Sequence, residues 1–179
     1  MKAGIEGKAD VLALWAPNTY TMQEKHGYEM FCNANDFKAG IYNAVITGRE
    51  YAKNQPESVK AFLAVMMRSI NWIKANPQQA QAFFVSNAKK EGVEVSANAA
   101  KSDYELRPLF NLDEQLQVMG GSPEKLNDSP AGRSFFSINV FLTEGKAGSR
   151  SMRPQSFIDI SFMQRLKADP KLSAFANSR

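Results

Sequence analysis

The residues best suited to bind a ligand lie in one short segment of this 179-residue chain. Two aromatic residues, Trp15 and Tyr20, enclose Pro17, Asn18 and Thr19. Because proline is favoured at the first helical position and Asn and Thr satisfy free N–H groups there, we expect a helix to begin in this segment. Free N–H groups at a helix N-terminus attract anions, and the aromatic rings would form walls. Two interpretations stay open: an anion-binding turn, or a plain helix start with packed aromatic residues.

The remaining reactive residue types do not form a catalytic set. His26 is the single histidine and Cys32 the single cysteine, so no metal-ligand set, disulfide or catalytic triad can be assembled from them. His26 is predicted at a helix C-terminus before Gly27, where an imidazole suits the helix dipole. Cys32 lies in an apolar run and is predicted to be buried. We therefore expect a binding protein with no enzymatic activity, no metal and no cofactor.

Composition limits the class of partner. Hydrophobic residues make up 44% of the chain and charged residues 22%, as in an ordinary globular protein. The net charge of +4 comes from scattered lysines and arginines, which do not form the basic cluster typical of a nucleic-acid-binding surface. No apolar run reaches the ~18 residues that suggest a membrane span. The N-terminal ten residues lack the apolar segment of an export signal, so none is expected in this chain.

The elements that would position the ligand-binding turn are three short strands and several helices. Continuous apolar residues predict strands at Asp10–Trp15, Tyr28–Asn33 and Ile41–Ile46, with a helix from Pro17 to His26 between the first two. From Thr47 onward the pattern is helical. Apolar residues at spacings of three and four place one stripe on a helix from Pro56 to Ala75: Val59, Phe62, Leu63, Met66, Met67, Ile70 and Ile73.

Proline, serine and glycine mark the later helices. We predict them at about 77–91, 97–106, 112–119, 130–144, 154–166 and 171–176. The predicted fold class is therefore α/β and helix-rich, with about three short strands followed by six or more helices. Three such strands cannot cover the faces of a sheet, which favours the C-terminal part of a larger fold.

Several of these segments resemble one family of transport proteins. The run from Gly7 to Tyr20 is similar to a segment of nitrate/sulfonate/taurine-type solute-binding proteins of ABC importers. Within Tyr42–Pro77 and just beyond it, the resemblance continues in order and spacing: Asn43–Ile46, Thr47–Tyr51, Gln55–Val59 and Trp72–Ala80. The tail Phe157–Met163 is similar to the family's closing helix.

The resemblance implies a fold and a function. In that family, of type II periplasmic-binding-protein fold, two α/β lobes close over a small, often anionic solute that is presented to a membrane permease. Residues 1–41 would be a remnant of the second lobe and the crossover, and residues 42–179 the C-terminal helical part of the first lobe. The implied location is the bacterial periplasm, and the implied ligand is sulfonate-, taurine- or nitrate-like.

The resemblance also implies a site. It places the turn from Trp15 to Tyr20 at the cleft between the lobes. Tyr42 and Asn43 would begin the strand after the crossover, on the opposite side of that cleft. They would offer a phenol and an amide to a ligand, although a strand edge with Asn43 bonded to nearby backbone is an alternative.

Two other functions stay open. An incomplete lobe would expose strand edges and apolar faces, which favours a ligand-sensing or interaction module that forms homo-oligomers or exchanges strands. Relatives of this fold also act as thiamine-pyrimidine synthases that use a histidine and pyridoxal. That alternative is weak here because His26 lies outside the expected site.

Overall fold

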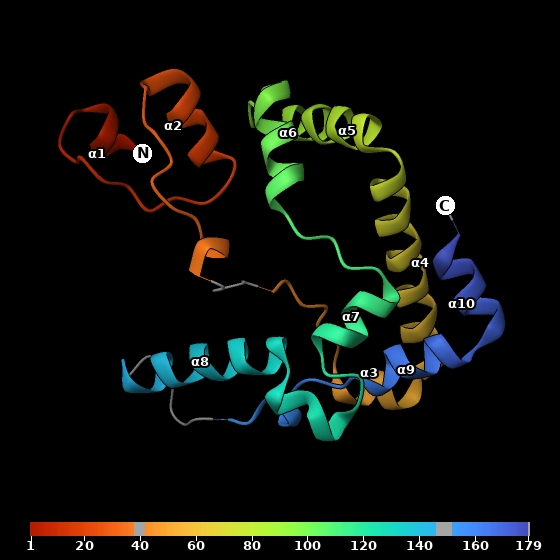
Figure 1. Cartoon of the computed structure of the whole chain (residues 1–179). Coiled ribbons are helices and arrows are strands. Elements are labelled where there is room, and N and C mark those ends of the chain that lie inside the picture. Colours follow the sequence, from red (N-terminus) through yellow and green to blue (C-terminus); the bar gives the residue numbers. More distant parts are fainter. Residues whose placement is uncertain (38–41, 146–151, 179) are drawn as a thin grey trace. The chain divides into compact units, whose positions relative to one another are not determined.

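The computed structural model describes residues 1–37, 42–145 and 152–178, and within these ranges the protein is built of helices and connecting segments (Figure 1). In chain order the α-helices are α1 (Lys2–Ile5), α2 (Asn18–His26), α3 (Arg49–Asn54), α4 (Pro56–Ala75), α5 (Pro77–Lys90), α6 (Ala97–Leu106), α7 (Leu112–Val118), α8 (Pro130–Glu144), α9 (Ser161–Ala168) and α10 (Pro170–Asn177). Short 3₁₀ helices lie at η1 (Ala34–Phe37), η2 (Pro123–Asp128) and η3 (Pro154–Ser156).

The α/β expectation is wrong, because the described residues contain no strand. Residues 10–15, 28–33 and 42–46 are irregular, and Ile41 lies outside the described residues. In the first segment exposed Val11 and Trp15 alternate with half-buried Leu12 and Leu14, as along an extended chain. An extended segment becomes a strand only when a neighbour accepts and donates its backbone hydrogen bonds. The apolar runs are real, but no paired neighbour exists among the described residues.

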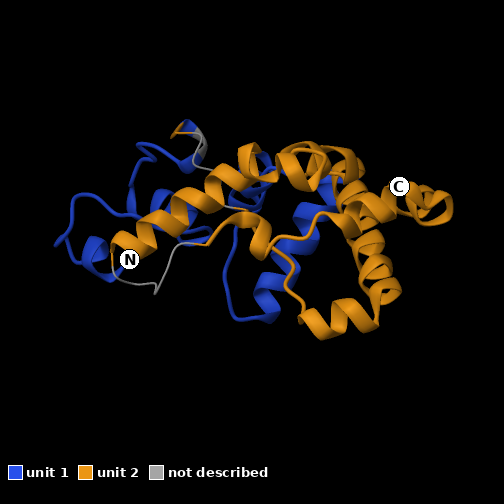
Figure 2. Ribbon diagram, turned by 90° about the horizontal axis from the view of Figure 1, so that it is seen from below, with its two compact units in different colours: residues 1–36, 76–109 blue, residues 37–75, 110–179 orange. Residues whose placement is uncertain are grey.

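The chain divides into two compact units (Figure 2). Unit 1 comprises residues 1–36 and 76–109, and unit 2 comprises residues 37–75 and 110–179. Each unit is therefore assembled from two stretches of chain, and the consecutive helices α4 and α5 belong to different units. The expected assignment of residues 1–41 and 42–179 to two lobes of the family fold stays a prediction.

Unit 1 combines α1, α2, α5 and α6. Tyr20 of α2 is buried in an apolar cluster with Val95, Ala99 and Ala100, and Phe84 and Val85 of α5 pack against it. The N-terminal segment is held by Tyr28, whose hydroxyl lies 2.8 Å from the carbonyl oxygen of Ala9 and 3.2 Å from that of Gly4. A short polar cluster thus fixes the start of the chain, while α2, α5 and α6 share an apolar core.

Unit 2 is organised around α4. The bounds predicted for this helix are confirmed, and it packs on α10, α9 and α3. Met67 and Ala64 of α4 are fully buried with residues of α7, α9 and α10, and the buried cluster also contains Leu112, Leu116, Ile160, Met163, Leu166 and Ala176. Of the predicted α4 stripe, Phe62 is the exception because it remains 54% exposed.

Several predicted helix ends are confirmed. Gly27 follows α2 in the left-handed conformation, with φ of 71°, which carries no Cβ penalty for glycine. Ser96 caps α6 by accepting from the backbone N–H of Ala99, and Ser129 caps α8 by accepting from Gly132. Pro17 differs by one position: it precedes α2, which begins at Asn18.

The structure differs from the sequence prediction at Cys32 and in the helix expected at 154–166. Cys32 was predicted to be buried, but its side chain is exposed, because residues 28–33 form no sheet whose far face could be covered. The predicted helix 154–166 is split into η3 and α9, and Asp159 accepts the N–H of Ser161 where α9 begins. Among the described helices, none combines the length and apolar character that crossing a bilayer requires.

Candidate functional site: a charged pocket in unit 1

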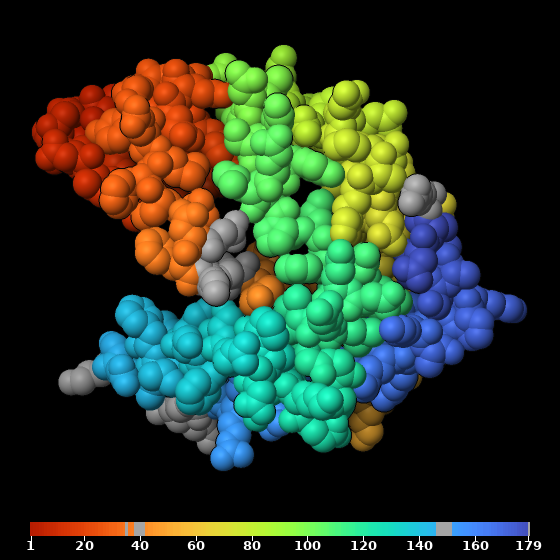
Figure 3. All heavy atoms as spheres, in the orientation of Figure 1, coloured from red at the N-terminus to blue at the C-terminus, as the bar shows by residue number. Residues whose placement is uncertain are grey.

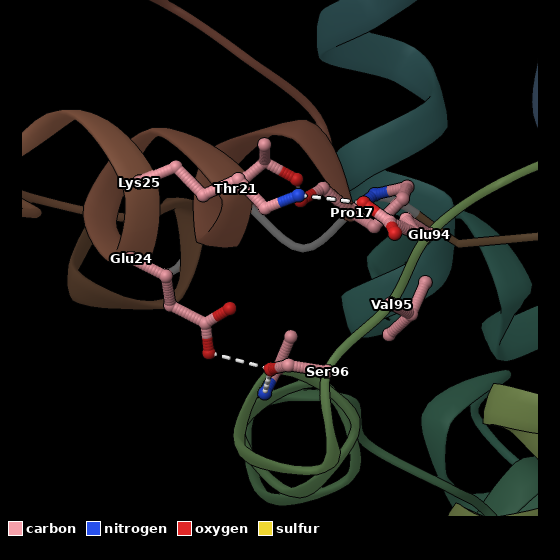
Figure 4. Close-up of a pocket in the computed structure, with 8 residues that line it drawn as sticks. Pro17, Thr21, Glu24, Lys25, Glu94, Val95 and Ser96 are labelled. Carbon is pink, nitrogen blue, oxygen red and sulfur yellow. Dashed lines mark hydrogen bonds and ion pairs between the residues drawn. The ribbon is translucent and has the colours of Figure 1, made fainter.

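A pocket of about 260 Å³ lies within unit 1 (Figure 4). One wall is the face of α2 and the residue before it, and the other is the segment that enters α6 together with the first turn of that helix. Its lining residues are Pro17, Thr21, Glu24, Lys25, Glu94, Val95, Ser96 and Ala99. On the α2 side, positions 17, 21, 24 and 25 lie on one side of the helix, because 21 is four residues from 17 and positions 24 and 25 are three and four residues from 21.

Two hydrogen-bonded contacts join the walls, and Figure 4 shows both. The ammonium of Lys25 lies 2.6 Å from Oε2 of Glu94. The hydroxyl of Ser96 donates to Oε1 of Glu24 over 2.6 Å and accepts from the backbone N–H of Ala99 over 2.9 Å. Ser96 therefore does two tasks: it caps α6 and connects that helix to the carboxylate of Glu24.

The pocket has a mixed charge set. Two carboxylates and one ammonium give a formal charge of −1. The hydrogen bond from Lys25 and its positive charge lower the pKa of Glu94, and Glu94 in turn raises the pKa of Lys25. Both partners are thus ionised near neutral pH. A site of this kind offers partners to both ends of a zwitterion, whereas its net charge repels a simple anion.

A second polar cluster lies in the same unit. Asp103 of α6 is buried, and Arg107 donates to its two oxygens over 3.1 and 2.9 Å. Burial raises the pKa of the Tyr20 phenol, and the charge of Asp103 raises it further while Arg107 lowers it. Tyr20 therefore remains a neutral phenol in the core of unit 1, where it helps to hold α2 against α6.

The structure places the predicted residues of the N-terminal turn in different environments. Pro17 lines the pocket, and Tyr20 is buried beside it in the apolar cluster. Trp15 is 70% exposed and Asn18 is exposed. The hydroxyl of Thr19 donates to the carbonyl oxygen of Leu14 over 3.3 Å. The turn supports one edge of the pocket, with a single predicted residue, Pro17, in its lining.

Tyr42 and Asn43 belong to unit 2. The ring of Tyr42 packs at 6.3 Å from that of Phe110 and at 6.4 Å from that of Phe135, whose own ring meets Phe157 edge to face. These centroid distances are typical of stabilising aromatic pairs. Tyr42 thus contributes to an aromatic cluster of unit 2, while Asn43 is exposed.

Sequence reasoning missed most of the pocket. A signal existed for Thr21, Glu24 and Lys25, which follow Pro17 along one helix face. For Ser96 the sequence indicated a helix cap, but its second bond to Glu24 joins residues that are 72 positions apart. Such a contact cannot be read from local spacing. In the described residues no group of three or more His, Cys, Asp or Glu side chains is arranged to hold a metal ion.

Comparison with known proteins gives one family. Residues 1–80 match the family model described as NMT1/THI5 like, a family of nitrate/sulfonate/taurine-type binding proteins. The matched region contains α1 to α4 and the α2 side of the pocket. No curated protein and no solved structure matches the chain. The family match suggests a solute-binding protein, in agreement with the resemblance in the sequence.

Proposed function

We propose that this chain is a substrate-binding component of an ABC importer, that it binds a small sulfonate-type solute, and that it performs no catalysis. The observation that carries the proposal is the match of residues 1–80 to a family of solute-binding proteins. The unit 1 pocket supports it, because polar groups from α2 and from the start of α6 converge there around one open hollow.

The charged side chains that line the pocket limit the class of solute that it can bind. Nitrate and simple alkanesulfonates have no group that would compensate the two carboxylates. An aminosulfonate such as taurine carries an ammonium for Glu24 or Glu94 and a sulfonate for Lys25 and the first turn of α6. Its ammonium would pair with Glu94 and its sulfonate with Lys25, in place of the internal Lys25–Glu94 contact, while Glu24 would keep the hydrogen bond from Ser96. The proposed solute is therefore of the taurine type.

The wider mechanism follows the family. Solute contacts would stabilise a closed arrangement of the binding-protein lobes over an open one, and the closed form would be presented to a permease in the bacterial periplasm. Only a ligand that contacts the two states differently can shift this equilibrium. A decrease in radius of gyration with solute, measured by small-angle X-ray scattering, is the expected signature.

A thermal-shift screen tests the proposed function. The panel contains taurine, alkanesulfonates, nitrate, bicarbonate and pyrimidines. A ligand present at a hundred times its dissociation constant adds about 2.7 kcal/mol to the folded state, which is easily detected. We expect taurine to raise the melting temperature more than the corresponding alkanesulfonate without an amine. A folded sample that responds to no member of the panel would contradict the proposal.

Variants connect a positive result to the pocket. Glu24→Gln and Glu94→Gln remove one carboxylate each and should weaken the response to taurine, whereas Glu29→Gln removes an exposed carboxylate outside the pocket and should not. Trp15→Ala tests the N-terminal turn separately, because Trp15 does not line the pocket. If Glu29→Gln weakened the response as strongly as the pocket variants, the assignment of the site would be wrong.

A second candidate function is a ligand-sensing or protein-interaction module. The observation that favours it is the number of large apolar side chains exposed in unit 2, among them Ile46, Phe62 and Phe141. The proposed route by strand exchange loses its basis in the described residues, which contain no strand. Self-association through helices is the remaining route, and taurine-independent oligomerisation would distinguish this candidate from solute transport.

A further inference from the structure

The two contacts across the unit 1 pocket are not equally easy to displace. Lys25 and Glu94 form an ion pair between side chains that are 55% and 87% exposed, and an ion pair in water contributes little to stability. Glu24 is bonded to Ser96, whose hydroxyl is fixed in turn because it accepts the backbone N–H of Ala99. A solute therefore displaces Lys25 from Glu94 more easily than it displaces Ser96 from Glu24.

Glu24 has a second carboxylate oxygen available to a ligand. Ser96 donates to Oε1, and Figure 4 shows the other oxygen of Glu24 pointing toward the open space between the two contacts. Glu94 reaches the same pocket from the segment that enters α6. Figure 3 shows α2, in orange, beside α6, in green. An ammonium group in this space would meet one carboxylate from each wall.

The rest of the lining offers no aromatic surface to a cation. Pro17, Val95 and Ala99 supply the apolar part, and the described residues that line the pocket include no Phe, Tyr or Trp. Trp15 and Tyr20 are neighbours of Pro17 in the sequence, but both lie outside the lining. Quaternary ammonium groups, which have no N–H, are typically recognised by aromatic faces. Recognition of a cation in this pocket therefore depends on its N–H donors.

We propose that Glu24 makes the site selective for primary and secondary ammonium groups over tertiary and quaternary ones. This inference rests on the proposed function and refines the class of solute. The ammonium of an aminosulfonate would donate one hydrogen bond to Glu94 and a second to Oε2 of Glu24, while the sulfonate pairs with Lys25. Both bonds require a nitrogen with at least two N–H groups. Taurine and N-methyltaurine meet this requirement, whereas N,N-dimethyltaurine and N,N,N-trimethyltaurine do not.

The selectivity would come from a carboxylate that is left without a partner. Methylation of an ammonium keeps its charge, so charge alone does not distinguish these solutes. A tertiary ammonium has a single N–H, so one of the two glutamates would lose water without gaining a hydrogen bond. Such bonds between charged groups are stronger than neutral ones, but Glu24 and Glu94 are exposed to water, which reduces the difference. We therefore expect a loss of affinity of about threefold to tenfold.

Isothermal titration calorimetry of the whole chain with this methylation series tests the proposal. For the wild type we expect similar affinities for taurine and N-methyltaurine, and a fall at N,N-dimethyltaurine. Glu24→Gln replaces one carboxylate oxygen by an N–H donor, so taurine should bind more weakly and the fall between the monomethyl and dimethyl compounds should disappear. The matched control is Glu29→Gln, at an exposed position outside the pocket, which should keep that fall. Circular dichroism of each variant verifies that helix content is retained.

The same variants separate hydrogen bonding from solute size. Each added methyl group enlarges the solute as well as removing an N–H, and Gln has the length of Glu. A fall caused by size would therefore persist in Glu24→Gln. In Ser96→Ala, Glu24 keeps its charge but loses the bond that holds Oε1, so the fall should become smaller although the carboxylate remains.

Three results would overturn the proposal, each in a different way. If the folded wild type binds no member of the series, the proposed function fails and this inference fails with it. If taurine binds but the dimethyl or trimethyl compound binds equally well, the solute-binding function stands and selectivity by Glu24 is wrong. If the fall persists in Glu24→Gln, the size of the solute is its cause.

Discussion

The interior of unit 1 is stabilised by different interactions from the interior of unit 2. The buried cluster of unit 2 is apolar and continuous over four helices, α4, α7, α9 and α10. The smaller buried cluster of unit 1 contains Tyr20 and is accompanied by two polar contacts. Glu24 and Ser96 link α2 to α6, and Asp103 pairs with Arg107 at the C-terminal end of α6. Unit 2 therefore depends mainly on packing, while unit 1 depends on charged and hydrogen-bonded pairs as well.

The two interiors are suited to different roles. Polar pairs between helices are costly to keep unless they satisfy each other, and a pocket lined by such pairs can exchange partners with a solute. An apolar core such as that of unit 2 cannot do this. The proposed solute site thus lies in the unit whose interior carries polar pairs.

The substitution with the largest expected effect on stability lies in the core of unit 2. Leu166 is fully buried, and Leu166→Ala should lower the free energy of unfolding by about 2–5 kcal/mol through lost burial and an unfilled cavity. Urea unfolding followed by circular dichroism measures it. Val65→Ala on the exposed side of α4 is the control and should change stability by less than about 0.5 kcal/mol. If both variants behaved alike, the apolar core of unit 2 would not be the main source of its stability.

The next effect is on the polar interior of unit 1. Asp103→Asn removes the negative charge and one of the two oxygens that accept from Arg107, and should cost about 2 kcal/mol. It should also lower the pKa of Tyr20, because Asp103 contributes to raising it; tyrosine NMR titration measures this. Glu105→Gln on the same helix, exposed and at 3.9 Å from Lys101, is the control. If the pKa of Tyr20 did not change, the charge of Asp103 would not act on the Tyr20 phenol, and the prediction would be wrong.

A smaller effect is expected at the edge of the pocket. Ser96→Ala removes both the cap of α6 and the bond to Glu24, and should cost about 1 kcal/mol. Ser86→Ala, at an exposed position within α5, lacks a capping role and serves as the reference. Thermal unfolding of the two variants compares them. Equal stability would show that the link between α2 and α6 does not contribute to unit 1.

The smallest effect concerns pH and unit 2. The hydrogen bond from Lys74 and that from the backbone N–H of Asn111 lower the pKa of Glu114 below its ordinary 4.5. A lowered pKa in the folded state stabilises the protein above the unfolded value, and this contribution is lost as the pH falls below it. Glu114→Gln should therefore reduce stability by at most about 1 kcal/mol at pH 7, and the difference should decrease as the pH falls through the lowered pKa of the folded state. A difference that stayed constant from neutral to acidic pH would contradict this assignment.

The helices could be predicted because their signals are local. Apolar spacing gave both ends of α4, and Ser96 and Ser129 gave the starts of α6 and α8. The absence of strands in the described residues could not be predicted, since an apolar run such as 10–15 becomes a strand only if a partner exists elsewhere in the fold. Most of the pocket could not be predicted for a similar reason. Pro17 could be identified from its turn, but the approach of Glu94 to Lys25 depends on how the two chain segments of unit 1 pack together.

The central claim is that the pocket of unit 1 binds a taurine-type solute, and an NMR titration of the isotopically labelled chain with taurine tests it most directly. We expect saturable shifts of the backbone amides at Glu24 and Lys25 on α2 and at Glu94 to Ala99 before and within α6. Glu94→Gln should weaken the binding. Shifts confined to residues outside unit 1, or no saturable shift in a folded sample, would contradict the account.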